Sequence, residues 1–122
     1  GDCVCAICEK KFSEQFLIAS HIIPVSVLKE KNVNMPRNDI FNSNNGLLLC
    51  PNHDKLFDKI FISFDEDNKI ILGNISEEEL DTFGLTKDFK LNKIYMTEDR
   101  KKNLRYHRNT LNLLNRIKSG DE

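Results

Sequence analysis

Two pairs of potential metal ligands stand far apart in this chain and share one spacing. Two residues separate Cys5 from Cys8, and two separate Cys50 from His53. Each short gap lets two side chains converge on one tetrahedral ion, as in structural zinc sites. We therefore predict one Zn²⁺ ion held by Cys5, Cys8, Cys50 and His53, tying the N-terminus to the middle of the chain. Cys3 is left over, either as a spare thiol or as a substitute for Cys5.

A metal-free interpretation of the same residues also stands. In it, Cys50 is a buried apolar residue and the N-terminal cysteines are free thiols. Disulfides are the less favoured use, because no secretory signal opens the chain.

Two aspartates form a second candidate metal site. Asp54 and Asp58 are four residues apart on a predicted helix and hence on one face. An acid in a first helical turn is favoured by the helix dipole, which explains Asp54 alone. Asp58 has no such explanation, and like charges at this spacing repel unless a cation lies between them. Oxygen ligands favour magnesium, manganese or calcium over a second zinc.

His21 is the candidate acid–base group. It lies in the apolar run "LIASHIIPV", where a histidine is either a satisfied core residue or a catalyst. Asn44 or Asn45, returning opposite that run, would fix the imidazole tautomer. A neutral histidine near a divalent metal can take a proton from water.

The hydropathy pattern predicts the elements that position these groups. The apolar stretch 16–25 predicts a strand that Pro24 stops. A polar loop, 28–45, then leads to a short buried strand, 46–50. Pro51 suits the first turn of a helix over 51–59, and residues 60–72 form a hairpin around the turn "DEDN".

Two more helices are predicted beyond the hairpin. A capping box of Ser76 and Glu79 starts a short helix that ends at Gly84. Thr97 caps a last helix, whose apolar stripe is expected to face the core: Leu104, Leu111, Leu114 and Ile117.

The composition limits the size and the class of the protein. The 122 residues, 39% of them hydrophobic, fit one domain with a modest core, and no apolar run is long enough to span a bilayer. We expect a cytoplasmic domain cut from a longer protein, because cysteines begin almost at residue 1. The net charge of −1 does not by itself indicate a nucleic-acid binder, although the C-terminal stretch is basic.

The combined pattern "ASHIIPV … NNGLLLCPNHDKLFD … ISF" resembles the HNH nucleases, in the branch associated with bacterial restriction and other defence proteins. The resemblance covers about residues 5–73, and the tail "LRYHRNTL" is also similar to that branch. It implies an α+β fold with a ββα-metal core, in which a β-hairpin and a helix surround one metal. The core with its treble-clef-like zinc site would span 1–75, and a helical extension, 76–122, would pack on it as part of one domain.

Site residues carry over position by position. His21 matches the general base, and Asn45, or alternatively Asn44, matches the central asparagine that positions the base or helps to hold the metal. In many members of the family a second cysteine is the last zinc ligand. His53 occupies that position in this chain. The third position of the motif, a metal ligand, is therefore Asp54.

Two further positions concern the catalytic cation. Asp58 matches a place where the family often has another ligand. Ser20 departs from the pattern, because many members have a histidine or aspartate there as a ligand. Either water and substrate oxygens complete a looser coordination shell around the catalytic cation, or the cation binds weakly and the domain does not cleave DNA.

The resemblance implies a metal-dependent endonuclease that hydrolyses DNA, preferably double-stranded, with one structural Zn²⁺ and one catalytic Mg²⁺ or Mn²⁺. A homodimer of the full-length protein is expected, since two cuts need two sites. Arg37, Arg105 and Arg108 are candidates to contact the DNA backbone, and His107 either meets phosphate or packs. The alternatives are an inactive zinc-stapled nucleic-acid-binding module and an RNase or toxin with the same site.

Overall fold

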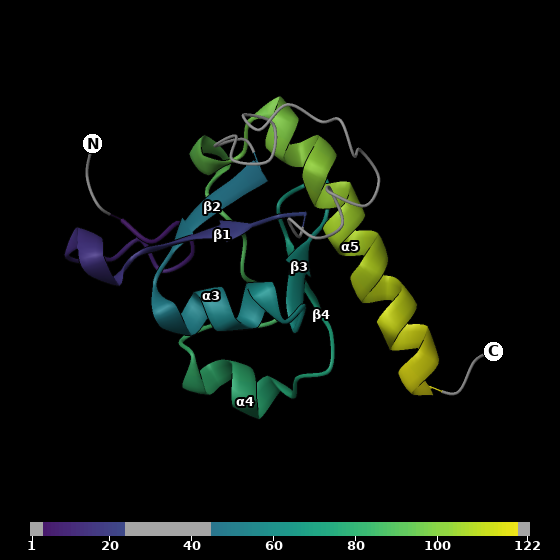
Figure 1. The fold of residues 1–122 in the computed structure, drawn as a ribbon. Coiled ribbons are helices and arrows are strands. Elements are labelled where there is room, and N and C mark those ends of the chain that lie inside the picture. The colour runs from purple at the N-terminus through teal and green to yellow at the C-terminus, as the bar shows by residue number, and fades with distance from the viewer. Residues whose placement is uncertain (1–3, 24–44, 120–122) are drawn as a thin grey trace.

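Two short strands from distant parts of the sequence form the first sheet (Figure 1). The computed structural model describes residues 4–23 and 45–119, so the predictions for Cys3, Arg37, Asn44 and the loop 28–44 lie outside it. Strand β1 (Ile18–His21) pairs antiparallel with β2 (Gly46–Leu49), and His21 is opposite Gly46. The end of β1 thus lies beside the start of β2, where Asn45 enters.

Helix α3 (Pro51–Asp58) follows β2 after one residue and packs against both strands of this sheet. Pro51 occupies the first turn, as predicted, because a helix start needs no N–H at that position. The buried face carries His53, Leu56 and Phe57, and the opposite side is open to solvent. The two strands and α3 form a strand–strand–helix unit (Figure 1).

The C-terminal end of α3 is closed by a double hydrogen bond around a strained residue. The Ile60 N–H donates to the Phe57 carbonyl at 3.1 Å, and the Phe61 N–H donates to the Leu56 carbonyl at 2.9 Å. This Schellman-type ending places Ile60 at φ 58°, where glycine is the usual residue. A left-handed conformation costs an L-residue with a Cβ roughly 1–2 kcal/mol, so the turn depends on its surroundings.

The predicted hairpin and the two predicted helices after it are confirmed. Strands β3 (Ile62–Phe64) and β4 (Ile70–Leu72) pair antiparallel across the turn "DEDN". Helix α4 (Glu77–Thr82) has both hydrogen bonds of the predicted capping box, and Gly84 follows it at φ 77°.

Helix α5 (Glu98–Ser119) begins after Thr97, whose Oγ1 accepts from the Arg100 N–H at 3.1 Å, as a cap should. Single 3₁₀ turns stand before β1 and before α5: η1 (Glu14–Phe16) and η3 (Lys93–Tyr95). None of the helices in the described ranges has the length and apolar character needed to cross a membrane.

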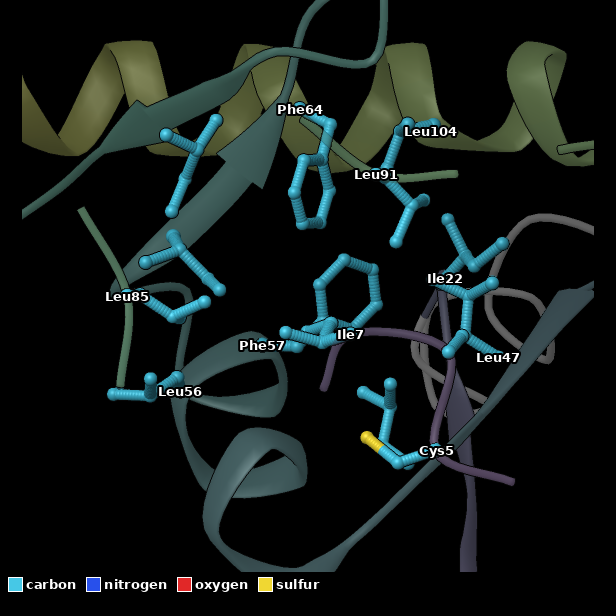
Figure 2. Packing of buried hydrophobic residues seen from close by; sticks show 14 of the residues in the cluster. Cys5, Ile7, Ile22, Leu47, Leu56, Phe57, Phe64, Leu85, Leu91 and Leu104 are labelled. Atoms are coloured by element: carbon cyan, nitrogen blue, oxygen red, sulfur yellow. The ribbon is translucent and has the colours of Figure 1, made fainter. Parts of the chain in front are cut away.

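The core lies between α3, the hairpin β3–β4 and the first half of α5, and it continues to the N-terminal turn and the β1–β2 sheet (Figure 2). Phe57 from α3 and Phe64 from β3 meet there, with ring centroids 6.4 Å apart. The prediction of one continuous core stripe on α5 was wrong in its second half. Leu104 and Leu111 are buried, but Leu114 and Ile117 are 47% and 65% exposed. The 22 residues of α5 extend beyond the hairpin (Figure 1), and these two side chains remain open to solvent in the described part of the chain.

Candidate metal centre and catalytic site

The predicted zinc ligands are brought together. The sulfur atoms of Cys5, Cys8 and Cys50 and a ring nitrogen of His53 all lie within 4.8 Å of one another. His53 Nδ1 is 3.4 Å from Cys50 Sγ and 3.6 Å from Cys5 Sγ. Tetrahedral zinc with ordinary bond lengths requires an N···S separation of about 3.6 Å. The cluster therefore has the donors and the dimensions of a Cys₃His zinc site.

Two tight local structures supply these ligands. At the N-terminus, the Cys5–Cys8 turn is closed by the Glu9 N–H, which donates to the Cys5 carbonyl at 2.8 Å, and Glu9 takes φ 56°. The Ala6 N–H donates to the Leu48 carbonyl at 2.8 Å, which joins this turn to β2. The other two ligands come from the junction of β2 and α3.

The extension beyond residue 75 contributes to the orientation of the histidine ligand. His53 Nε2 lies 2.9 Å from the carbonyl oxygen of Phe83, the residue that caps α4. A carbonyl only accepts, so Nε2 carries the hydrogen and Nδ1 presents its lone pair to the sulfur atoms. Sequence reasoning did not find Phe83, because a backbone carbonyl has no sequence signature.

The thiols of the cluster differ in acidity. Burial raises the pKa of Cys5, but its contact with the His53 ring and the hydrogen bonds from backbone N–H groups outweigh burial and bring that pKa to about 6. Burial, together with the neighbouring Cys5 and Cys50, raises the pKa of Cys8 to about 11. One thiolate is thus available at neutral pH, and a bound cation would draw the proton from the others.

Asn45 fixes the backbone just beyond His21. Its Oδ1 accepts from the Ile23 N–H at 2.8 Å, and its Nδ2 donates to the Ile23 carbonyl at 2.9 Å. The Ile22 N–H also donates to the Asn45 carbonyl at 2.9 Å. Asn45 is buried, whereas His21 is half-buried and its imidazole makes no hydrogen bond with another described residue. Both the oxygen and the nitrogen of the amide therefore hold the backbone just beyond the end of β1.

Asp54 and Asp58 both lie on α3. Asp54 is half-buried in the first turn and Asp58 is exposed in the last. Within the described ranges neither carboxylate has a hydrogen bond or an ion pair. Ser20, directly before His21, is 2% exposed, and its hydroxyl has no hydrogen-bond partner there. Carboxylates and a hydroxyl are oxygen donors of the kind that a hard divalent cation takes, so each of these residues fits such an ion by its chemistry.

The two described DNA-backbone candidates differ. Arg108 is turned inward: its side chain is 13% exposed, Nη1 donates to the Phe64 carbonyl at 2.9 Å, and Nη2 lies 3.8 Å from Glu66. Arg105 is exposed beside a groove of about 430 Å³. Acidic and basic side chains share that groove: Asp65, Glu66, Asp67, Glu98, Lys101, Lys102, Arg105 and Arg108. The basic stretch is thus partly offset by acids from the β3–β4 turn.

His107 is buried, with 3% of its surface exposed, and it packs inside the protein. Packing was one of its two predicted roles.

The comparison with models of protein families gives a match. A family model described as HNH endonuclease matches residues 5–65, which is half of the 122-residue chain. The matched range begins at Cys5, ends just after β3 and includes every residue discussed above from His21 to Asp58. No curated protein matches the chain.

Proposed function

This chain belongs to the HNH endonuclease family, and we propose that it is a metal-dependent endonuclease that hydrolyses phosphodiester bonds in DNA. The observation that carries the proposal is the contrast at the end of β1. Asn45 holds the backbone there with two hydrogen bonds, while the His21 imidazole beside it is free of any described partner. A fixed backbone with an uncommitted imidazole is the arrangement that a general base needs.

In this proposal the four-ligand cluster is structural. Cys5, Cys8, Cys50 and His53 would bind one Zn²⁺ ion and leave no open position for substrate. Buried thiolates and a histidine oriented by a carbonyl make a closed site, and no water-binding face is needed there. The treble-clef-like zinc site would thus act as a staple that sets the start of α3.

Asp54 and Asp58 are proposed to hold the catalytic cation, Mg²⁺ or Mn²⁺. When bound, that cation supplies Lewis-acid stabilisation of the charge that develops on the phosphate and on the leaving oxygen. Asn45 is assigned the positioning role rather than a ligand role, since Ile23 uses its amide.

His21 is proposed to accept the proton of the attacking water. Its ring must stay neutral for that, and its half-buried position leaves one side open to water. The bonds from Asn45 to Ile23 hold the backbone beside His21 in place, so that this backbone does not have to be ordered during the reaction. Arg105 would contact the phosphate backbone without reading sequence.

Several finer points belong to the same proposal. The substrate would be double-stranded DNA, cut by a homodimer of the full-length protein in a cytoplasmic bacterial restriction or defence system. Residues 1–75 and 76–122 would form a single domain. The hydrogen bond between His53 and the Phe83 carbonyl, which crosses that boundary, supports this arrangement. The described cysteines are free thiols, in keeping with a reducing compartment.

Plasmid nicking separates a nuclease from a non-cutting zinc module. Zinc-loaded protein is incubated with supercoiled plasmid and Mn²⁺ or Mg²⁺, in parallel with Asp58→Asn and with an EDTA-quenched sample. We expect nicking by the parent and strong loss in the variant, with zinc content equal in both. DNA binding without nicking in any metal would favour the module. Cleavage of RNA but not of DNA would move the same site to the RNase alternative.

A further inference from the structure

A buried histidine on α5 joins the end of α3 to the next strand. His107 Nε2 lies 2.8 Å from the Phe57 carbonyl oxygen, and Nδ1 lies 2.8 Å from Ser63 Oγ. Its ring stacks on the Phe57 ring, with centroids 4.0 Å apart and planes at 9°. Because a carbonyl only accepts, Nε2 carries the hydrogen, and Nδ1 therefore accepts from the Ser63 hydroxyl. Both ring nitrogens are used, so the imidazole is held in one orientation.

The Phe57 carbonyl belongs to the strained last turn of α3. It accepts from the Ile60 N–H at 3.1 Å as well, and Ile60 is the β-branched residue at φ 58°. Such a conformation persists only where the surrounding structure over-determines it. The bond from His107, fifty residues further along the chain, is one contact that does so.

Asp58 follows Phe57 directly and depends on the same turn. Its exposed carboxylate has no bond to another described residue, so the backbone alone sets its position. Asp54 lies one turn earlier, and the two carboxylates stay on one face only while the last turn remains helical. We propose that His107 is a positioning residue of the nuclease site, which holds the last turn of α3 and thereby keeps Asp58 in place for the divalent cation. The inference rests on the proposed function, because it takes Asp58 as a ligand.

The test measures metal affinity without DNA. His107→Phe keeps an aromatic ring on Phe57 and removes both hydrogen bonds. Asn115→Leu is the matched control, since Asn115 also joins α5 to a backbone carbonyl at 3.1 Å, but that carbonyl belongs to Leu72 of β4 and not to α3. The Mn²⁺ dissociation constant of zinc-loaded protein is measured by electron paramagnetic resonance. We expect His107→Phe to weaken Mn²⁺ binding roughly 10- to 100-fold and Asn115→Leu to leave it unchanged.

A second comparison distinguishes positioning from general loosening of the fold. In the Asp58→Asn background, His107→Phe should weaken Mn²⁺ binding no further, because the ligand that it positions is already gone. A further loss of the same size in that background would overturn the inference. So would parent-like Mn²⁺ binding by the single variant, and in that case the proposed function would still stand.

Two other outcomes are also decisive. If Asp58→Asn leaves Mn²⁺ binding unchanged, the ligand assignment fails and the role of His107 fails with it. If His107→Phe does not retain zinc, Ser63→Ala replaces it as the milder variant, because Ser63 orients the imidazole from its other nitrogen. Weaker Mn²⁺ binding by zinc-loaded Ser63→Ala would support the inference, and unchanged binding would overturn it.

Discussion

The side-chain amide of Asn45 makes two hydrogen bonds with the backbone of Ile23, one to its N–H at 2.8 Å and one to its carbonyl at 2.9 Å. Ile23 stands two residues beyond His21, which is the last residue of β1. An amide that both accepts from and donates to one residue mimics a strand partner and extends the pairing past the last ladder position. The proposed base therefore stands on a strand end with a defined course.

Replacing Asn45 by alanine should damage both the fold and cleavage. The two lost bonds leave the Ile23 N–H and carbonyl without their partners, at a cost of about 1–3 kcal/mol in the free energy of unfolding. We also expect a lower rate of plasmid nicking with unchanged zinc content. Urea unfolding and a nicking time course measure the two effects. Asn112→Ala, at an exposed position of α5, is the control. Parent-like nicking by Asn45→Ala would remove the positioning role.

The zinc assignment predicts different results for two adjacent residues. His53→Ala should lose the metal and much of the stability, because a closed structural site couples its binding energy to folding. Asp54→Asn should keep one Zn²⁺ per chain and lose cleavage instead. Elemental analysis of the purified variants measures the metal content. Loss of zinc from Asp54→Asn, or its retention by His53→Ala, would show that the two roles are exchanged.

The pKa of His107 predicts how stability changes in acid. Burial lowers this pKa and outweighs both the hydrogen bond with the Phe57 carbonyl and the Asp58 carboxylate, which raise it. Below the unfolded value of 6.5, the unfolded chain binds a proton that the folded chain does not, so stability falls as pH drops through this window. Acid also protonates the proposed zinc ligands, but it does so equally in the parent and in the His107→Phe variant, so this effect cancels in the comparison. The unfolding free energy of His107→Phe should therefore fall less than that of the parent between about pH 7 and pH 5.5. Equal losses would contradict this.

The apolar residues of α5 should divide into two classes. Leu111→Ala removes a fully buried side chain and should cost about 2–5 kcal/mol in unfolding free energy. Ile117→Ala changes a side chain that is 65% exposed and should stay within about 0.5 kcal/mol of the parent. Chemical denaturation of the two variants compares them. A large loss for Ile117→Ala would mean that another surface covers the end of α5.

Local patterns predicted the elements well where the signal lies in neighbouring residues. The capping box at Ser76, the Pro51 start of α3 and the Thr97 cap were each confirmed because their chemistry is complete within one turn. The clustering of the four predicted zinc ligands was also confirmed, since the spacing within each pair suits convergence on one ion. The apolar period of α5 correctly predicted a helix, but it could not show where the core beneath that helix ends.

Long-range contacts through the backbone could not be predicted. The Phe83 carbonyl beside His53 and the Ile23 backbone beside Asn45 have no residue-type signature. Arg108 was predicted to meet phosphate from its charge alone, and the structure instead engages it with Phe64 and Glu66. Charge along a sequence does not show which face of a helix is already occupied.

The central claim is that His21 is the base of a metal-dependent nuclease, and one rate ratio tests it most directly. Initial rates of plasmid nicking are measured at saturating Mn²⁺ for the parent and for His21→Ala, with zinc content verified as equal. The proposed role predicts a fall of about 10²- to 10⁴-fold, the usual contribution of a positioned acid or base. Equal rates for the two zinc-loaded proteins would contradict it.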